Sequence, residues 1–424
     1  MSPATDALTA HLLDIVRRVR HQLGEDDLAD DPAARFADLL DSMGMVEFVA
    51  ILAGECGVEP AAIEECVNHR FGTVADLAGA MSAAGLRAVG SACRAGPEEG
   101  PARQAGPTLP CWLSATAVRF PETTQPAAAI NQALGRPAGW FESHAGIESR
   151  RLWAGQDPLS GAKEAAADCL REAELAAKDV GALLVTSEAP PRLAGLGAAL
   201  HHRLGLSAGA VVLEVGNACT GFLSALWAAE SLLARVGPVL VVAVEAPSHF
   251  LEIRPGAAGE TAALFGDGAA AALLCERPIG QCPVPLAEIL LGVDGDAADL
   301  LRVERSAVGL VELRMDGAAL AGRALKAMAE GVRTLAGRHG LEVSGLEAVV
   351  CHGGNGRLPG LLARQLGLPP ERVWSETPRT GNLGSASLPA AWARHRPSPH
   401  GPVAWAAVGA GLTWGAALSG VEWE

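Results

Sequence analysis

Cys219 is the residue of this sequence whose position most clearly suggests chemistry. It follows the apolar run VVLEV, which predicts a buried strand, and precedes FLSALWAAESLLA, which predicts a helix. A thiol at the start of a helix lies at the positive end of the helix dipole, which favours the nucleophilic thiolate. Small neighbours such as Gly216 and Gly221 would let a substrate approach the backbone closely. A packed core cysteine is the alternative, but these surroundings favour a functional nucleophile.

A repeated pattern links Cys219 to two further polar residues. A strand at 182–186, a helix and the turn GNACTGF are followed later by a strand at 346–351, a helix and the turn GNLGSAS, which holds Asn382. Two copies of one unit, related by a pseudo-twofold axis, would bring the two turns together at the centre of the domain. His352 follows the later strand and is expected beside them. Taken alone, His352 could be a hydrogen-bonded residue at a strand end, and Asn382 a turn residue.

Ser42 is a separate candidate for covalent modification. It stands in FADLLDSMGMVEFVAIL, where it opens an amphipathic helix, so its hydroxyl is expected to be exposed on a rigid element. A lone serine in this position is usually only a helix N-cap. The segment resembles the acyl carrier protein family, whose D-S-L motif stands here as Asp41-Ser42-Met43, and FGTVADLAGAM resembles the start of that family's last helix. The resemblance implies that Ser42 carries 4'-phosphopantetheine.

The later part of the sequence resembles the type III β-ketoacyl-carrier-protein synthases of the thiolase-like superfamily. NACTGF is similar to that family's N-A-A-C-[AS]-G-F nucleophile motif. In the same order as in the family follow TAALFGDGAAAALL, the H-x-x-N of CHGGNGR, the turn GNLGSAS and the closing VGAGLTWGAAL. The glycine-rich GDGA could alone suggest phosphate binding, but that signal is weak, and within the resemblance it is structural. We therefore predict no nucleotide cofactor.

The resemblance implies a role for each matching residue. Cys219 would be the acyl-accepting nucleophile, and the backbone N–H groups of Cys219 and Ala410 would stabilise the oxyanion. The family has glycine where Ala410 stands, although a backbone donor survives this change. His352 and Asn382 would hydrogen-bond the thioester oxygen of a malonyl-type extender, and Asn355 would orient His352.

Four positions depart from the family or shape its pocket. Trp140 and AGIESRR are similar to the W-x-x-x-R-T-G-I-x-x-R-R motif, but His144 is found where the coenzyme A-stacking arginine is expected, which makes a carrier-bound donor more plausible. Leu193 stands near a position that is often aromatic and would shape the acyl pocket. Glu188 is the counterpart of His352 in the repeat. Relatives that condense without decarboxylation have a glutamate nearby, but an exposed loop carboxylate is the favoured interpretation.

Composition and charge exclude several classes of function. The net charge is −15, which argues against nucleic acid as a partner. Residues 1–86 contain fifteen acidic residues and five arginines, a net charge of −10, as in an acidic module that meets a basic surface. The nine cysteines show no C-x-x-C pair, so we expect neither a disulfide framework nor a metal site. Without a signal sequence or an apolar run of membrane-spanning length, a cytoplasmic protein is expected, with no membrane partner.

The expected organisation is a carrier domain fused to a synthase. We predict an all-α carrier bundle at 1–85, a flexible Gly/Pro/Ala-rich linker at 86–110, and an α/β thiolase fold with five αβαβα layers and duplicated halves at 111–280 and 281–424. A flexible linker of 25 residues spans roughly 25–30 Å, which gives an effective concentration in the millimolar range. The resemblance suggests a homodimer through the synthase half.

These features predict a condensing acyltransferase. An acyl group on Cys219 would be attacked by a decarboxylated malonyl-type extender to give a β-ketoacyl thioester, in polyketide or fatty-acid-like biosynthesis. Acyl and malonyl thioesters on carrier protein or coenzyme A, and a phosphopantetheinyl transferase, are the expected partners. One alternative is an acyltransferase of the same fold that moves the acyl group to an oxygen or nitrogen nucleophile. Another is a non-catalytic carrier scaffold.

Overall fold

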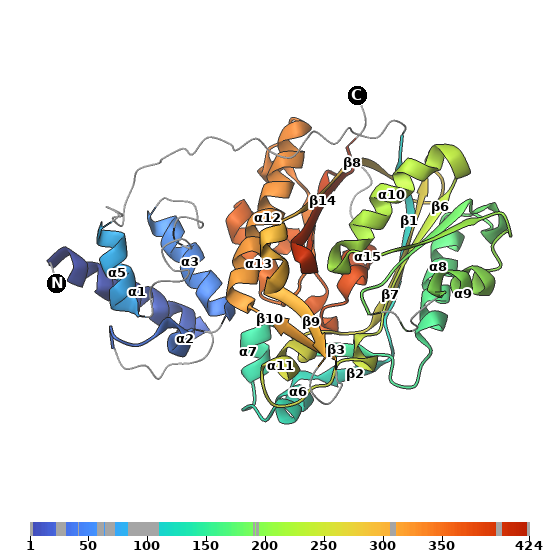
Figure 1. Ribbon diagram of the computed structural model, residues 1–424. Coiled ribbons are helices and arrows are strands. Elements are labelled where there is room, and N and C mark those ends of the chain that lie inside the picture. The colour runs from blue at the N-terminus through green and yellow to red at the C-terminus, as the bar shows by residue number, and fades with distance from the viewer. Residues whose placement is uncertain are drawn as a thin grey trace. The chain divides into compact units, whose positions relative to one another are not determined.

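The computed structural model describes residues 3–22, 31–40, 42–56, 63, 73–83, 110–189, 191, 195–305, 311–395 and 401–421 (Figure 1). The chain divides into two compact units, one of residues 1–101 with 316–323 and one of residues 102–315 with 324–424. The predicted linker at 86–110 lies, apart from residue 110, outside the described residues. No helix in the described ranges combines the length and the apolar character needed to cross a membrane.

The described part of the first unit is helical. Its helices are α1 (Pro3–Gln22), α2 (Phe36–Leu39), α3 (Ser42–Cys56) and α5 (Val74–Ala83). Their apolar faces meet in one core, in which Leu12, Phe48 and Leu52 are fully buried. Thr73 and Asp76 cap the start of α5 reciprocally, since each side chain accepts a hydrogen bond of 3.2 Å from the other residue's backbone N–H.

The second unit is organised around one mixed sheet of ten strands, in the order β12-β11-β13-β14-β8-β1-β7-β6-β4-β5. The strands of this sheet are β1 (Trp112–Arg119), β4 (Ala182–Thr186), β5 (Val211–Val215), β6 (Val239–Glu245), β7 (Gly268–Cys275), β8 (Val284–Val293), β11 (Ala348–Cys351), β12 (Val373–Trp374), β13 (Val403–Gly409) and β14 (Thr413–Ser419). Two small sheets pair β2 (Thr123–Pro126) with β3 (Ser149–Leu152) and β9 (Leu301–Arg305) with β10 (Val311–Met315).

The helices of this unit lie between and outside the strands. They are α6 (Ala127–Leu134), α7 (Trp140–Ala145), α8 (Pro158–Glu172), α9 (Leu196–Leu204), α10 (Gly221–Val236), α11 (Ala257–Ala263), α12 (Gly317–Arg338, which belongs to this unit from residue 324), α13 (Leu358–Leu366), α14 (Thr377–Thr380) and α15 (Ser387–His395). Short 3-10 turns join several of these elements, among them η2 (Ala218–Thr220), η7 (Gly384–Ala386) and η8 (Ala410–Leu412).

The sheet consists of two halves with the same topology, as the repeated sequence pattern predicted. The strands of one half-sheet have the order β5-β4-β6-β7-β1, and those of the other half-sheet have the order β12-β11-β13-β14-β8. In each half the first three strands are parallel and the next two run antiparallel to their neighbours. The halves join through a short pairing of β1 with β8, so they form one continuous sheet. The predicted boundary at residue 280 falls between β7 and β8.

Alternating side chains of the strands pack against helices on both faces of each half-sheet. The unit therefore has five layers: outer helices, a half-sheet, central helices, the other half-sheet and outer helices. Along β6, Val241 packs into the core that contains α10, while its neighbour Val242 packs into the core that contains α8 and α9. Along β14, a Cβ on Gly415 would contact Leu223 of α10, and a Cβ on α12 Gly331 would lie 2.9 Å from the Cβ of Ala416. Helices α10 and α15 therefore lie between the two half-sheets, as Figure 1 shows, with α8 and α9 outside one half and α12 outside the other.

Candidate active site

Cys219 lies in the turn that connects β5 to α10. The two residues before it, Asn217 and Ala218, adopt positive φ values of 108° and 48°, which non-glycine residues rarely do. Gly221 opens α10, and a Cβ there would lie 2.2 Å from Thr186 Oγ1 of β4, so only glycine lets the helix start this close to the strand. The Cys219 side chain is 4% exposed. The turn therefore holds the thiol at the N-terminal end of a 16-residue helix, inside the protein.

His352 and Asn382 come from the other half of the unit. His352 follows β11 directly, and its Nε2 lies 3.1 Å from Asn382 Oδ1. The same Oδ1 accepts a hydrogen bond of 2.9 Å from the backbone N–H of Gly384, which fixes the amide. Both side chains are 4% exposed. Burial lowers the pKa of His352 to about 4, so this imidazole is neutral at neutral pH.

The structure brings Cys219, His352 and Asn382 together. The Asn382 side chain hydrogen-bonds the Cys219 thiol, which acts to lower the thiol's pKa, and its other end meets His352. Strands β5 and β11 lie in different halves, and the pseudo-twofold axis between them carries the two Gly-Asn turns to the centre of the unit. The juxtaposition expected from the repeat is therefore present in the fold.

The expectation that the start of α10 yields a thiolate is corrected by the surroundings of Cys219. Burial, followed by the neighbouring charges of Glu188 and Glu245, raises the pKa of the Cys219 thiol well above its ordinary value. A helix terminus contributes about 0.3–1 kcal/mol, or about 2 kcal/mol at most. Burial in an apolar interior disfavours the charged thiolate, and two nearby carboxylates disfavour it further, so both effects oppose the dipole. The resting nucleophile is therefore a thiol.

Glu188 is not the exposed loop carboxylate that the sequence favoured. Its Oε2 accepts a hydrogen bond from Cys219 Sγ over 3.1 Å, and its side chain is partly buried. Burial raises the pKa of Glu188, while the bond to Cys219 opposes this shift. A carboxylate thus lies in direct contact with the sulfur.

Glu245 is a residue of this site that the sequence analysis missed. It ends β6, is 1% exposed, and its carboxylate accepts hydrogen bonds from the backbone N–H groups of Glu188, Ala189 and Ser385 at 2.8–3.0 Å. Burial and the charge of Glu188 raise the pKa of Glu245 to about 7. Its only signal in the sequence is a single acidic residue at the end of the otherwise apolar run VLVVAVE.

Ala410 lies close to the backbone of the nucleophile. A Cβ on its neighbour Gly409 would lie 3.0 Å from the backbone nitrogen of Cys219 and 3.2 Å from the Cβ of Ala218. The two turns are also joined by a hydrogen bond of 2.8 Å between the hydroxyls of Thr220 and Thr413. The strand β13 thus ends against the Cys219 turn, which places Ala410 next in the chain after a residue in close contact with that turn.

The predicted role of Asn355 in orienting His352 is wrong. Its Oδ1 accepts from the backbone N–H of Arg357 over 2.9 Å, and its Nδ2 donates to the backbone carbonyl of His144 over 3.4 Å. Within the part of the chain that the structure describes, it makes no hydrogen bond to His352. The spacing H-x-x-N suggested a direct contact, but Asn355 instead fastens the loop after β11 to the end of α7.

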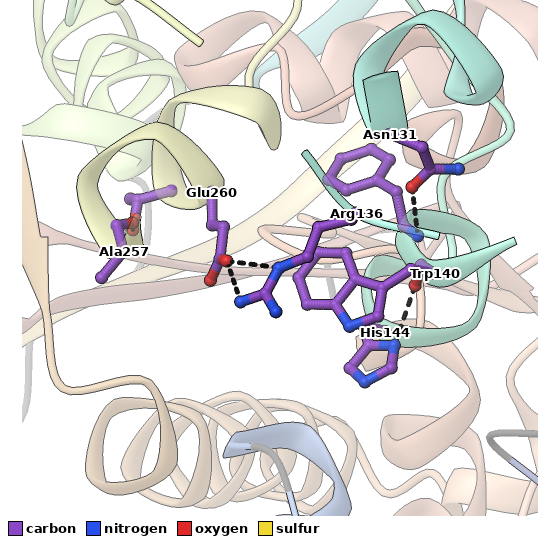
Figure 2. A network of polar contacts seen from close by, with 8 residues as sticks. Asn131, Arg136, Trp140, His144, Ala257 and Glu260 are labelled. Atoms are coloured by element: carbon purple, nitrogen blue, oxygen red, sulfur yellow. Dashed lines mark hydrogen bonds and ion pairs between the residues drawn. The ribbon is translucent and has the colours of Figure 1, made fainter. Parts of the chain in front are cut away.

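Trp140 and His144 form a stacked cluster on α7, shown in Figure 2. Their rings are stacked with centroids 4.4 Å apart, and the Arg136 guanidinium lies 4.5 Å from the centroid of the indole. His144 Nδ1 lies 2.8 Å from the backbone carbonyl of Trp140, and Arg136 forms an ion pair with Glu260. Two side chains of this chain therefore lie against the indole. Leu193, the other predicted pocket residue, lies outside the described residues.

Comparison with known proteins identifies the family. The family described as 3-oxoacyl-[acyl-carrier-protein (ACP)] synthase III matches residues 213–295, and its C-terminal family matches residues 337–421. A 3-oxopimeloyl-[acyl-carrier-protein] synthase from Rhodothermus marinus is 34% identical over 72% of this chain and 91% of the relative. A β-ketoacyl-[acyl-carrier-protein] synthase III from Pseudomonas aeruginosa is 35% identical over 65% of this chain and 86% of the relative.

Solved structures lead to the same family. The crystal structure of 3-oxoacyl-(acyl carrier protein) synthase III, FabH, from Pseudomonas aeruginosa superposes with a TM-score of 0.65 at 30% identity, covering 73% of this chain and 97% of that one. The fold, the central turns and the sequence matches agree. The chain belongs to the 3-oxoacyl-[acyl-carrier-protein] synthase III family and is an acyl-transferring, condensing enzyme.

Proposed function

We propose that the enzyme joins an acyl group on Cys219 to a malonyl-type extender and releases a β-ketoacyl thioester and CO₂, in polyketide or fatty-acid-like biosynthesis. The observation that carries this proposal is the buried His352–Asn382 pair, 3.1 Å apart and hydrogen-bonded through Asn382 to the thiol. Two neutral N–H donors beside a nucleophile suit a reaction in which negative charge develops on a thioester oxygen.

The two half-reactions use different donors. In the first, Cys219 attacks the donor thioester, and the oxyanion meets the backbone N–H groups of Cys219 and Ala410. In the second, the malonyl-type thioester places its carbonyl oxygen against His352 and Asn382, and loss of CO₂ leaves an enolate that these donors stabilise. The enolate carbon attacks the acyl carbonyl, and the Cys219 sulfur leaves. A neutral His352 ring carries one N–H, on the Nε2 that lies 3.1 Å from Asn382 Oδ1, and the thioester oxygen would replace that Oδ1 as its acceptor when the extender binds.

Measurement of CO₂ tests this function against transfer to oxygen or nitrogen. The acylated enzyme is mixed with a carboxyl-labelled malonyl thioester, and CO₂ and product are counted together. Condensation releases one CO₂ for each β-ketoacyl thioester formed. Acyl transfer to an alcohol or amine without CO₂ release would establish the acyltransferase alternative. If neither reaction is observed, the non-catalytic scaffold is the remaining interpretation.

We also propose that residues 1–85 are an acyl carrier domain. The support is the helical character of α1, α3 and α5, the acidic composition, and the place of Ser42 as the first residue of the 15-residue helix α3. A serine at the start of a rigid helix is a fixed point of attachment for phosphopantetheine, which would supply a flexible thiol for acyl groups. The helix itself is anchored by Phe48 and Leu52, both fully buried.

Replacement of Ser42 tests the attachment site. The full chain, treated with coenzyme A and a phosphopantetheinyl transferase, should gain the mass of one phosphopantetheine, and Ser42→Ala should gain none. Ser82→Ala is a matched control, because Ser82 is an exposed serine on another helix of the same unit. Modification of Ser42→Ala to the wild-type extent, measured by intact-protein mass spectrometry, would contradict the proposal.

A carrier protein, not coenzyme A, is the proposed donor of the acyl group. The support is the cluster in Figure 2: His144 and Arg136 already lie against the Trp140 indole. A nucleotide base that stacked on this indole would compete with these side chains for the ring surface. Acyl transfer from a loaded carrier should therefore exceed transfer from the same acyl-coenzyme A.

We propose a homodimer formed through β5. This strand is the last in the ten-stranded sheet, and Val211 and Leu213 on it are 38% and 40% exposed. An open edge with exposed apolar side chains favours pairing with a second strand. Trp227 on the adjacent α10 is also exposed, at 45%.

Charges on this edge should separate the subunits. The double replacement of Val211 and Leu213 by lysine should halve the mass of the particle in light scattering, because lysines on an edge strand block pairing. Val293→Lys serves as control, since Val293 is 65% exposed and lies on a different strand. A mass unchanged by the double replacement would exclude this interface.

A further inference from the structure

The proton of Cys219 has a specific acceptor in this structure. The Cys219 thiol donates a hydrogen bond to Glu188 Oε2, with Sγ and Oε2 3.1 Å apart. Asn382 also contacts the sulfur, but an amide does not take up a proton. Since the thiol's pKa is raised well above its ordinary value, attack on a thioester requires a base at neutral pH.

His352 is poorly suited to be that base. Its Nε2 is engaged with Asn382 Oδ1, and burial lowers its pKa to about 4. Glu188 differs in both respects, because its Oε2 contacts the thiol itself and burial raises its pKa above that of an ordinary carboxylate. A base whose pKa moves towards the working pH transfers protons more effectively.

We propose that Glu188 is the general base of Cys219: it takes the thiol proton during acylation and returns a proton to the sulfur after condensation. During acylation the sulfur–hydrogen bond breaks as the new carbon–sulfur bond forms, and the proton moves to Glu188. The bond between the acyl carbon and the donor sulfur then breaks, and the proton passes from Glu188 to the departing thiolate. Glu188 ends this step as a carboxylate.

The second step, which rests on the function proposed above, needs one proton from solvent. Loss of CO₂ leaves an enolate whose carbon bonds to the acyl carbon, and the carbon–sulfur bond to Cys219 breaks. The Cys219 thiolate accepts a proton through Glu188, which is refilled from water. The site then holds a thiol and a carboxylate again.

Glu245 positions the base. The backbone N–H of Glu188 donates to both oxygens of the Glu245 carboxylate, with nitrogen–oxygen distances of 2.9 and 3.0 Å. The backbone N–H of Ala189 donates to the same carboxylate over 2.8 Å. A Cβ on Gly384 would lie 3.0 Å from Glu245 Oε1 and 3.3 Å from Glu188 Oε2, so a glycine leaves room for the two carboxylates. Among the residues that the structure describes, Glu245 and Cys219 are the titratable groups that interact with Glu188. These contacts use the backbone of Glu188, so they survive a change of its side chain.

The variant Glu188→Gln keeps the shape of the side chain and removes the base. At pH 7 the single-turnover acylation of Cys219, followed by intact-protein mass spectrometry, should slow by about 10²- to 10⁴-fold. Glu188→Asp retains a carboxylate and should recover part of the rate. Glu122→Gln, which removes one exposed carboxylate far along the chain from the site, should acylate like the wild type.

The pH profile separates a base from a carboxylate that only suppresses the thiolate. Wild-type acylation should fall at acid pH as Glu188 is protonated and should level off above its raised pKa. In Glu188→Gln the rate should rise about tenfold per pH unit, because only solvent then removes the proton from a thiol of high pKa. If Glu188 merely repelled the thiolate, Glu188→Gln would acylate at the wild-type rate or faster at pH 7, and the proposal would be overturned.

These readouts do not depend on the condensation itself. Acylation is measured without extender, so Glu188 is tested even if no β-ketoacyl product forms. CO₂ release from the malonyl thioester is measured separately, and Glu188→Gln should retain it, since His352 and Asn382 are unchanged. Equal melting temperatures of wild type and variants exclude misfolding as the cause of a slow acylation.

Discussion

Cys219→Ala should form no acyl-enzyme and should lose condensation by about 10⁶-fold, the size of effect found when a covalent nucleophile is removed. The thiol is the group that bonds the acyl carbon, and the neighbouring side chains cannot replace it: His352 and Asn382 are donors, and Glu188 is a carboxylate hydrogen-bonded to the missing sulfur. Acylation is measured by intact-protein mass spectrometry after mixing with acyl donor, and product by chromatography.

A second cysteine provides the control for this experiment. Cys282 is exposed, lies between β7 and β8, and is a free thiol, so it would react with any donor that labels cysteines without selection. Cys282→Ala should acylate and condense like the wild type. An acyl adduct of equal yield on Cys219→Ala would mean that another residue is the nucleophile.

The sequence predicts that Cys219 lies near Asn382 and His352, because the repeated unit determines the strand end at which each residue is placed. Cys219 follows the end of β5 and His352 the end of β11, strands that run parallel to β4 and β13 in their own halves. Residues after the carboxyl ends of parallel strands gather at one edge of a sheet, and the pseudo-twofold axis joins the two edges. Motif spacing and duplication together are therefore sufficient to place these side chains near one another.

The contact between Glu188 and Glu245 could not be predicted in this way. It depends on the register of β4 with β6, in which Thr186 pairs with Ala243. Two residues further along each strand, the chain reaches Glu188 and Glu245, which therefore lie side by side at the sheet's edge. The repeat identifies Glu188 as the counterpart of His352 but gives no sign of Glu245, and a register is not visible in one sequence.

The charge state of Cys219 was predicted incorrectly for a similar reason. The start of α10 was visible as a change from strand to helix periodicity, and it suggested a thiolate. The carboxylates that reverse this effect approach from β4 and β6, which lie distant in sequence. A local dipole can be predicted from sequence, but the burial and the charges that outweigh it come from tertiary structure.

His352→Ala should reduce CO₂ release from a malonyl-type thioester by about 10²- to 10³-fold, the effect of removing one donor from a developing oxyanion. Acylation of Cys219 should continue, because the thiol's own contacts are with Glu188 and Asn382. His352→Gln, which restores an amide donor, should recover part of the rate. His202→Ala is the matched control, since His202 is an exposed histidine on α9.

The pH dependence of CO₂ release identifies the state in which His352 acts. Burial holds its pKa at about 4, below the ordinary 6.5, so protonation begins only as the pH falls towards 4 and the ring is neutral above that range. CO₂ release by an enzyme already acylated should therefore show no loss attributable to this histidine between about pH 5.5 and 8. A rate that fell as the pH rose through 6.5 in the wild type, but not in His352→Ala, would mean that the charged imidazolium is the donor. Neutrality matters here because an N–H on an uncharged, buried ring can strengthen its hydrogen bond to the enolate oxygen without the free-energy cost of burying a charge.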